Sequence, residues 1–71
     1  MPILTCVVNR RVWGWIENTS RVLPLEKGEK VRVECPPELK YPTVEFCRAY
    51  RNGQTIRFFK DYLKNMKCEV A

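Results

Sequence analysis

The sequence contains no histidine, and this absence limits the chemistry that the chain can perform. Without an imidazole there is no general base that titrates near neutral pH, no Cys–His pair and no Ser–His–acid triad. The glycines Gly14, Gly28 and Gly53 stand alone, so no glycine-rich loop is available to hold a phosphate chain. The carboxylates are also spread singly along the chain. We therefore expect no catalytic residue, no metal site, no cofactor and no enzyme activity.

Long apolar runs are missing as well. No segment approaches the ~18 apolar residues that a membrane-spanning helix needs. In the first residues, MPILTCVVNRR, the arginines follow the apolar patch instead of preceding it, and no small-residue cleavage site comes after them. We expect an intracellular, cytoplasmic protein without a membrane partner. A chain of 71 residues with 45% hydrophobic content should form a single domain over residues 1–71. A chain of this size should have a stability of about a few kcal/mol.

The four cysteines are Cys6, Cys35, Cys47 and Cys68, and no two of them form a Cys-x-x-Cys pair. Zinc sites usually contain such a pair, so a four-cysteine site would have to be assembled from dispersed strands. The even number also permits two disulfides, with three connectivities. Each cysteine falls in or beside an apolar strand pattern, and the chain is interpreted as intracellular. We therefore expect buried, reduced thiols that act as small hydrophobic side chains.

Short β-rich runs dominate the first half of the chain. Residues 3–8 and 11–17 are two such runs, and the two residues between them predict a hairpin with a tight turn. Residues 18–29 form an irregular excursion with several turn-forming residues. Residues 30–35, KVRVEC, alternate between apolar and charged side chains, as in a half-buried strand, and two prolines follow them.

The segment 43–51, TVEFCRAYR, can be interpreted in two ways. As a helix, it would start at a Thr43 cap and present Val44, Cys47 and Tyr50 on one stripe. As a strand, it would alternate its apolar side chains between two faces. The β-branched and aromatic content favours the strand, and no Glu or Gln stands three residues after Thr43 to complete a capping box. The Asn-Gly pair that follows suits both a type I′ hairpin and a helix C-terminus.

The end of the chain is predicted to close the fold. QTIRFF should return as a strand with Ile56 and Phe58 directed inward. The segment KDYL should form a short helical turn in which Tyr62 and Leu63 face the core. KCEV at 67–70 is short enough to be a closing edge strand.

This order of elements resembles that of SH3-like small β-barrels. The likeness rests on the loop at 18–29 followed by KGEKVRV, and on a hairpin with Asn-Gly at its turn. It also rests on GQTIRFFKDYL, which is similar to the SH3 segment from the distal hairpin to the helical turn. The resemblance implies a mostly β fold, a barrel of five to six antiparallel strands with one short helical turn near the C-terminus. The Ala-Leu-Tyr-Asp-Tyr stretch and the tandem tryptophan are absent, so proline-peptide binding is not implied. Other SH3-like barrels bind DNA, RNA or protein.

Positive charge is concentrated in the last third of the chain. The net charge is +5, and residues 48–67 contain six Lys and Arg against Asp61 alone. Aromatic residues interleave with these cations, which is typical of a face that binds polyanions. Trp13 and Trp15 share one face of their strand, and they form either part of the core or an exposed stacking platform. The predicted nucleic-acid-binding residues are Arg10, Arg11, Trp13, Trp15, Arg48, Arg51, Arg57, Phe59, Lys60 and Lys64.

We therefore expect a non-enzymatic binding module that contacts DNA or RNA through a basic-aromatic face. The alternative is a protein–protein interaction module that engages an acidic surface, such as a small accessory subunit or a phage-type inhibitor of a host enzyme. Aromatic and arginine side chains are frequent anchors of such interfaces. Exposed strand edges at 3–8 and 67–71 would also permit a homo-oligomer.

Overall fold

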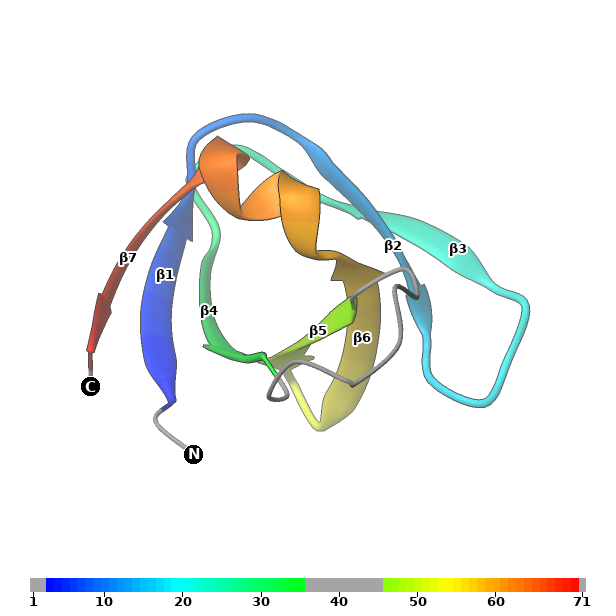
Figure 1. Cartoon of the computed structure of the whole chain (residues 1–71). Helices are drawn as coiled ribbons and strands as arrows, with labels where there is room; N and C mark the ends of the chain where they lie inside the picture. The colour runs from blue at the N-terminus through cyan, green and yellow to red at the C-terminus, as the bar shows by residue number, and fades with distance from the viewer. Residues whose placement is uncertain (1–2, 36–45, 71) are drawn as a thin grey trace.

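The computed structural model describes residues 3–35 and 46–70, and within them it contains seven strands and one short 3₁₀ helix (Figure 1). The elements are β1 (Leu4–Val8), β2 (Val12–Ile16), β3 (Val22–Leu25), β4 (Lys30–Glu34), β5 (Phe46–Arg51), β6 (Gln54–Phe59), η1 (Lys60–Asn65) and β7 (Met66–Val70). The prediction of a mostly β fold with a helical turn near the C-terminus is confirmed.

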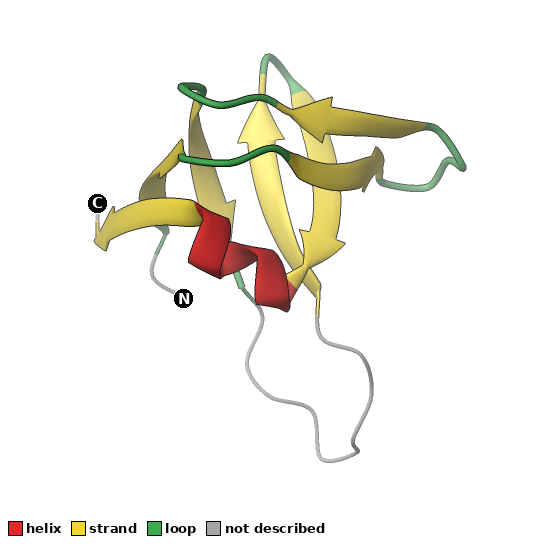
Figure 2. Ribbon diagram, turned by 90° about the horizontal axis from the view of Figure 1, so that it is seen from above, coloured by secondary structure: helices red, strands yellow, loops and turns green. Residues whose placement is uncertain are grey.

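The strands of the described residues form one antiparallel sheet in the order β3-β2-β6-β5-β4-β1-β7. The sheet curls into a half-barrel, and the β2–β3 hairpin extends away from the body (Figures 1 and 2). The prediction of five to six strands was too low because β3 lies inside the segment 18–29, which had been interpreted as irregular. The sequence VLPL does not alternate clearly, and it contains Pro24, which is tolerated because β3 is an edge strand.

The inner face of the curl holds the core. In β4, Val31 and Val33 are buried while Lys30, Arg32 and Glu34 point outward, as the alternation of KVRVEC predicts. Small and medium-sized apolar side chains make up most of the core because the strands curve tightly around it. The buried set is Cys6, Val8, Val12, Leu25, Val31, Val33, Cys47, Ala49, Ile56, Phe58 and Met66.

The helix η1 runs from the end of β6 to the start of β7 across the opening of the curl (Figure 1). Tyr62 and Leu63 pack against the core from this helix, as predicted, although neither is fully buried. Among the described residues, no helix is long and apolar enough to cross a membrane.

The hairpin of β5 and β6 resolves the ambiguity over segment 43–51 in favour of a strand from Phe46 onward. Residues 43–45 lie outside the described residues. At the turn, Asn52 has φ 48° and Gly53 has φ 78°. Positive φ at both central residues is the signature of a type I′ turn, whose twist matches that of the strands it joins. Asn and Gly adopt this conformation at low cost, so the local sequence fixes the register of the hairpin.

The predicted hairpin of residues 3–8 and 11–17 is wrong. β1 pairs with β4 and β7, whereas β2 pairs with β3 and β6. The connection does not close a two-strand turn, because the backbone amides of Asn9 and Arg10 both donate to the carbonyl oxygen of Asn65, at 2.8 and 3.2 Å. The chain is thus tied to the end of η1, and β2 starts on the other side of the curl. β1 is therefore an interior strand and not the exposed edge that had been expected, while β7 is an edge as predicted.

The prediction of reduced thiols is also wrong, because the four cysteines form two disulfides. Cys6 pairs with Cys68 and Cys35 with Cys47, with Cα–Cα distances of 4.0 and 4.3 Å. The first bridge joins directly opposite residues of β1 and β7. Linear spacing conceals this relation because the partners are 62 positions apart in the sequence, and only the return of β7 to β1 brings them together.

At Gly14 the backbone of β2 lies close against β6. A Cβ atom at this position would lie 2.6 Å from the carbonyl oxygen of Arg57 and 2.8 Å from Cγ2 of Ile56. Both distances are shorter than a real Cβ contact allows, and the first neighbour is backbone. Glycine is therefore required for the two strands to approach each other here.

Candidate functional site

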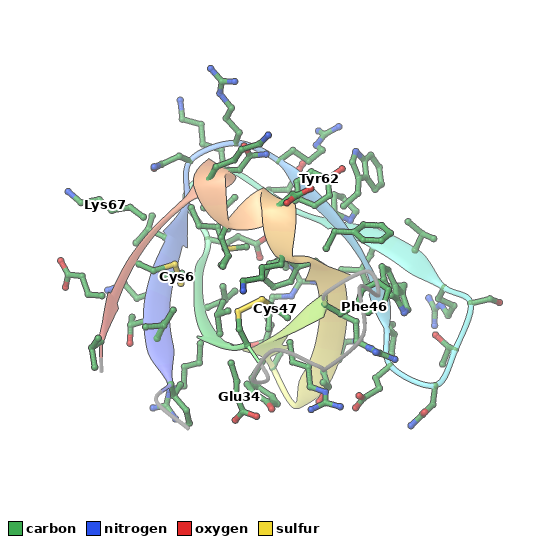
Figure 3. All side chains as sticks on the ribbon, viewed as in Figure 1. Cys6, Glu34, Phe46, Cys47, Tyr62 and Lys67 are labelled. Atoms are coloured by element: carbon green, nitrogen blue, oxygen red, sulfur yellow. A yellow bond between two sulfur atoms is a disulfide. The ribbon has the colours of Figure 1, made fainter. Side chains whose placement is uncertain are left out.

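The outer face of β2, β5 and β6 carries most of the large side chains of these strands. In β5, Phe46 points away from the curl while Cys47 points into it (Figure 3). In β6, Phe58 is fully buried and its neighbour Phe59 is 42% exposed. In β2, Trp13 is 47% exposed. The strand period of two thus separates a closely packed inner face from an aromatic outer one.

Three rings on this outer face contact each other. The centroid of Trp15 lies 5.1 Å from that of Phe46 and 5.5 Å from that of Phe59, both in edge-to-face geometry. Phe46 and Phe59 are cross-strand partners with centroids 5.1 Å apart. Such ring pairs add about 0.5–1.5 kcal/mol beyond burial, so they hold one another in place. Together with Trp13, which shares their side of the sheet, these rings are called the aromatic patch: Trp13, Trp15, Phe46 and Phe59.

Two arginines lie opposite each other beside the patch. Arg48 and Arg57 are cross-strand partners on β5 and β6. Like charges in this arrangement repel, and the protein offsets the repulsion in two ways. Arg48 donates from Nε to Oε1 of Glu17 at 2.9 Å, and the guanidinium carbon of Arg57 lies 4.9 Å from the centroid of Phe46. Among the described residues, the buried Nε of Arg57 has no hydrogen-bond partner.

The structure brings five of the ten predicted site residues to this one face. They are Trp13, Trp15, Arg48, Arg57 and Phe59. The other five lie at its margins or elsewhere. Their positions decide how much positive charge reaches the aromatic patch.

The β1–β2 connection supplies two of the remaining cations. Arg11 forms a bidentate pair with the carboxylate of Glu26, with Nε–Oε1 at 2.6 Å and Nη2–Oε2 at 3.1 Å. The hydrogen bond to Glu26, and then its negative charge, raise the pKa of Arg11 above the ordinary value. The same guanidinium lies 5.7 Å from the ring centroid of Trp13, so it borders the aromatic patch. Arg10 is exposed in the same connection.

The last three predicted cations lie at the two ends of the β5–β6 hairpin. Arg51 is half-buried near the turn and contacts both carboxylate oxygens of Glu29, with Nη1–Oε1 at 2.8 Å. It therefore stabilises the fold at a distance from the aromatic patch. Lys60 and Lys64 are carried by η1, and the exposed Lys64 lines a hollow together with Phe59, Asp61 and Tyr62. The helix thus extends the outer face beyond Phe59.

Sequence reasoning left Phe46 out of the site, although this residue contacts two rings and one guanidinium. A signal existed, because strand periodicity places Phe46, Arg48 and Tyr50 on one face. It was obscured because segment 43–51 could also be interpreted as a helix.

Comparison of the chain with protein-family models, curated proteins and solved structures finds no match in any of the three. Only the geometry and chemistry of the site therefore point to a function.

Proposed function

We propose that this protein is a non-enzymatic, SH3-like binding module that takes single-stranded DNA or RNA on the outer face of β2, β5 and β6. The Arg48–Arg57 pair beside the aromatic patch is the observation that carries this proposal. Two opposed, partly exposed arginines repel each other, and a bound polyanion would relieve this repulsion further than Glu17 and Phe46 do. An anionic ligand would also offer acceptors to the terminal nitrogens of the Arg57 guanidinium.

The aromatic and the basic side chains would contact different parts of a single strand. Its bases are free to stack on the exposed rings of Trp13 and Phe59, and stacking of this kind contributes about 1–3 kcal/mol per base. One phosphate would replace Glu17 as the ion-pair partner of Arg48, and another would contact Arg57 directly. Lys64 adds a positive side chain beyond Phe59, whereas the charge of Arg11 is offset by Glu26. Nothing in this arrangement reads a base edge, so binding should be tolerant of sequence.

Fluorescence anisotropy with labelled single strands of about twelve nucleotides tests the proposal, at about 50 and 200 mM salt. We expect affinity to fall with salt, with a log–log slope near −0.7 for each phosphate contacted. Arg57→Gln should weaken binding at least about tenfold. Arg21→Gln removes the same charge from an exposed loop and should leave affinity nearly unchanged. Undetectable binding at low salt, or equal effects of the two variants, would contradict the proposal.

A second candidate, a protein partner, is favoured by two observations. Three of the predicted cations, Arg11, Arg48 and Arg51, already form ion pairs. The apolar surface also continues onto the edge strand, where Val22 lies opposite Trp15 and is 66% exposed. Aromatic anchors with arginine are common interface hot spots. Association of the pure protein, measured by light scattering and abolished by Trp13→Ala, would favour a homo-oligomer over nucleic acid.

A further inference from the structure

A second surface feature lies on the outer face of β1, β4 and β5, away from the aromatic patch. It is a hollow lined mainly by Thr5, Lys30, Arg32, Tyr50, Arg51 and Asn52. The sheet register explains how these residues meet. Arg32 pairs with Thr5 on one side and with Tyr50 on the other, so one row of side chains crosses the three strands of the hollow. Glu69 of β7 lies opposite Thr5 at the next position of this row, outside the lining of the hollow.

The charge of this hollow is positive. No carboxylate lines it among the described residues. Arg51 is paired with Glu29, so its charge is offset. Lys30 and Arg32 are both exposed, and neither has an ion-pair partner among the described residues. The hollow therefore presents two cationic side chains whose charge is not balanced by a neighbouring carboxylate within it.

Neutral hydrogen-bonding groups complete the lining. The hydroxyl of Thr5 and the amide of Asn52 can both donate to an anion. Asn52 is held in place by the type I′ turn, and Thr5 sits on an interior strand. Tyr50 contributes a hydroxyl and a ring that is 37% exposed. Aromatic rings beside phosphate-binding cations are suited to hold a base or sugar next to the phosphate.

We propose that this hollow binds a phosphate monoester. A monoester carries about −1.5 to −2 charge near neutral pH, which matches the two unbalanced cations. An internal phosphodiester carries a single charge and matches them less well. Arg32 supplies a planar fork of donors for two phosphate oxygens, and Lys30 supplies a point charge. Both a free nucleotide and the phosphorylated end of a nucleic-acid strand have this chemistry.

The test is a titration of ¹⁵N-labelled protein with inorganic phosphate and with adenosine monophosphate, monitored by NMR. We expect saturable shifts at Thr5, Arg32, Tyr50 and Asn52 that chloride at matched ionic strength does not produce. The double variant Lys30→Gln/Arg32→Gln should weaken binding at least about tenfold. The proposal would be overturned if none of the shifts saturates, or if chloride produces the same shifts.

A matched control removes the same charge elsewhere. Arg21→Gln combined with Lys27→Gln alters two exposed side chains outside the hollow, and it should leave phosphate binding nearly unchanged. Equal losses in the two double variants would also overturn the proposal, because they would indicate a general charge effect. Both changes in each variant are at exposed positions, so the folded spectrum should persist.

Oligonucleotides with and without a 5′-phosphate distinguish the two sources of the ligand. A gain of at least about tenfold from the terminal phosphate identifies the end of a strand. Saturable binding of the mononucleotide with no such gain identifies a free nucleotide. The outcome is independent of the aromatic patch, since Trp13→Ala/Phe59→Ala should abolish strand stacking while leaving phosphate binding intact.

Discussion

The two faces of the same strands differ in what they carry. Of the aromatic side chains in the described residues, Phe58 alone is fully buried, and the rest of the core consists of smaller residues. The outer face carries Trp13 and Phe59, each more than 40% exposed. A tightly curled sheet has a narrow interior that suits β-branched and small side chains, because a larger group would overpack it. We therefore expect the bulky rings outside to contribute less to folding than Phe58 does.

Neighbouring phenylalanines give the sharpest test of this difference between the faces. Phe58→Ala should cost about 3–5 kcal/mol of unfolding free energy, because it leaves a cavity in the core. Phe59→Ala should cost only about 1 kcal/mol, mainly lost ring contacts, while strongly reducing binding to single strands. Urea denaturation measures the first quantity and anisotropy the second. Similar stability losses in the two variants would contradict the separation of roles.

The disulfides provide the next largest effect, and they differ from each other. Loop-closure entropy predicts a loss of about 4 kcal/mol for Cys6→Ala/Cys68→Ala, whose partners are 62 residues apart. The corresponding loss for Cys35→Ala/Cys47→Ala, with a separation of 12, is about 3 kcal/mol. Thermal unfolding with and without reductant checks both values. Alkylation of native, unreduced protein at all four cysteines would show that the bridges do not form.

Adding a methyl group to the inner side should cost more than removing an indole from the outer side. Gly14→Ala would force β2 away from the Arg57 carbonyl and should destabilise the protein by about 1–3 kcal/mol. Trp13→Ala should cost at most about 1 kcal/mol, since nearly half of the side chain is exposed. Chemical denaturation of both variants sharpens the comparison. The reverse order would indicate that the outer aromatic side chains are a second core.

The smallest expected change in stability is at Arg57. Arg57→Met removes a buried Nε that has no partner within the described residues and keeps an apolar stem over Phe46. We expect stability to stay within about 1 kcal/mol of the parent, because the lost cation–π contact is offset by relief of repulsion with Arg48. Binding to single strands should still fall. A large loss of stability would show that Arg57 is needed to stabilise the fold.

Local sequence patterns are sufficient to predict those strands that have an apolar face and a charged face. KVRVEC alternates without interruption, so the sequence predicts β4 directly. Asn52-Gly53 suits a type I′ hairpin or a helix C-terminus, so for the segment before it the sequence leaves two alternatives, a strand and a helix. The partner of each strand could not, because partner choice depends on how the whole sheet curls. For this reason the sequence wrongly predicts a hairpin of β1 with β2 and gives no sign of the Cys6–Cys68 bridge.

In the candidate site, too, the sequence predicts which neighbouring residues share a face but not which distant residues contact each other. Strand periodicity places Trp13 and Trp15 together, and Arg57 with Phe59. Composition could not show that Arg51 would be neutralised by Glu29, which is 22 positions away along the chain. The cytoplasmic location stays a prediction, and two disulfides weigh against it, because such bridges persist mainly in oxidising compartments.

Pro24 determines how copies of this protein could join through their sheets. β3 and β7 are the terminal strands of the described sheet, and fibre growth by strand addition requires two receptive edges on each molecule. Proline has no amide hydrogen to give to an incoming strand, so growth is blocked at β3. Two molecules that meet through β7 leave no receptive edge behind them. We therefore expect any self-association by this route to end at a closed pair and not to continue into a filament.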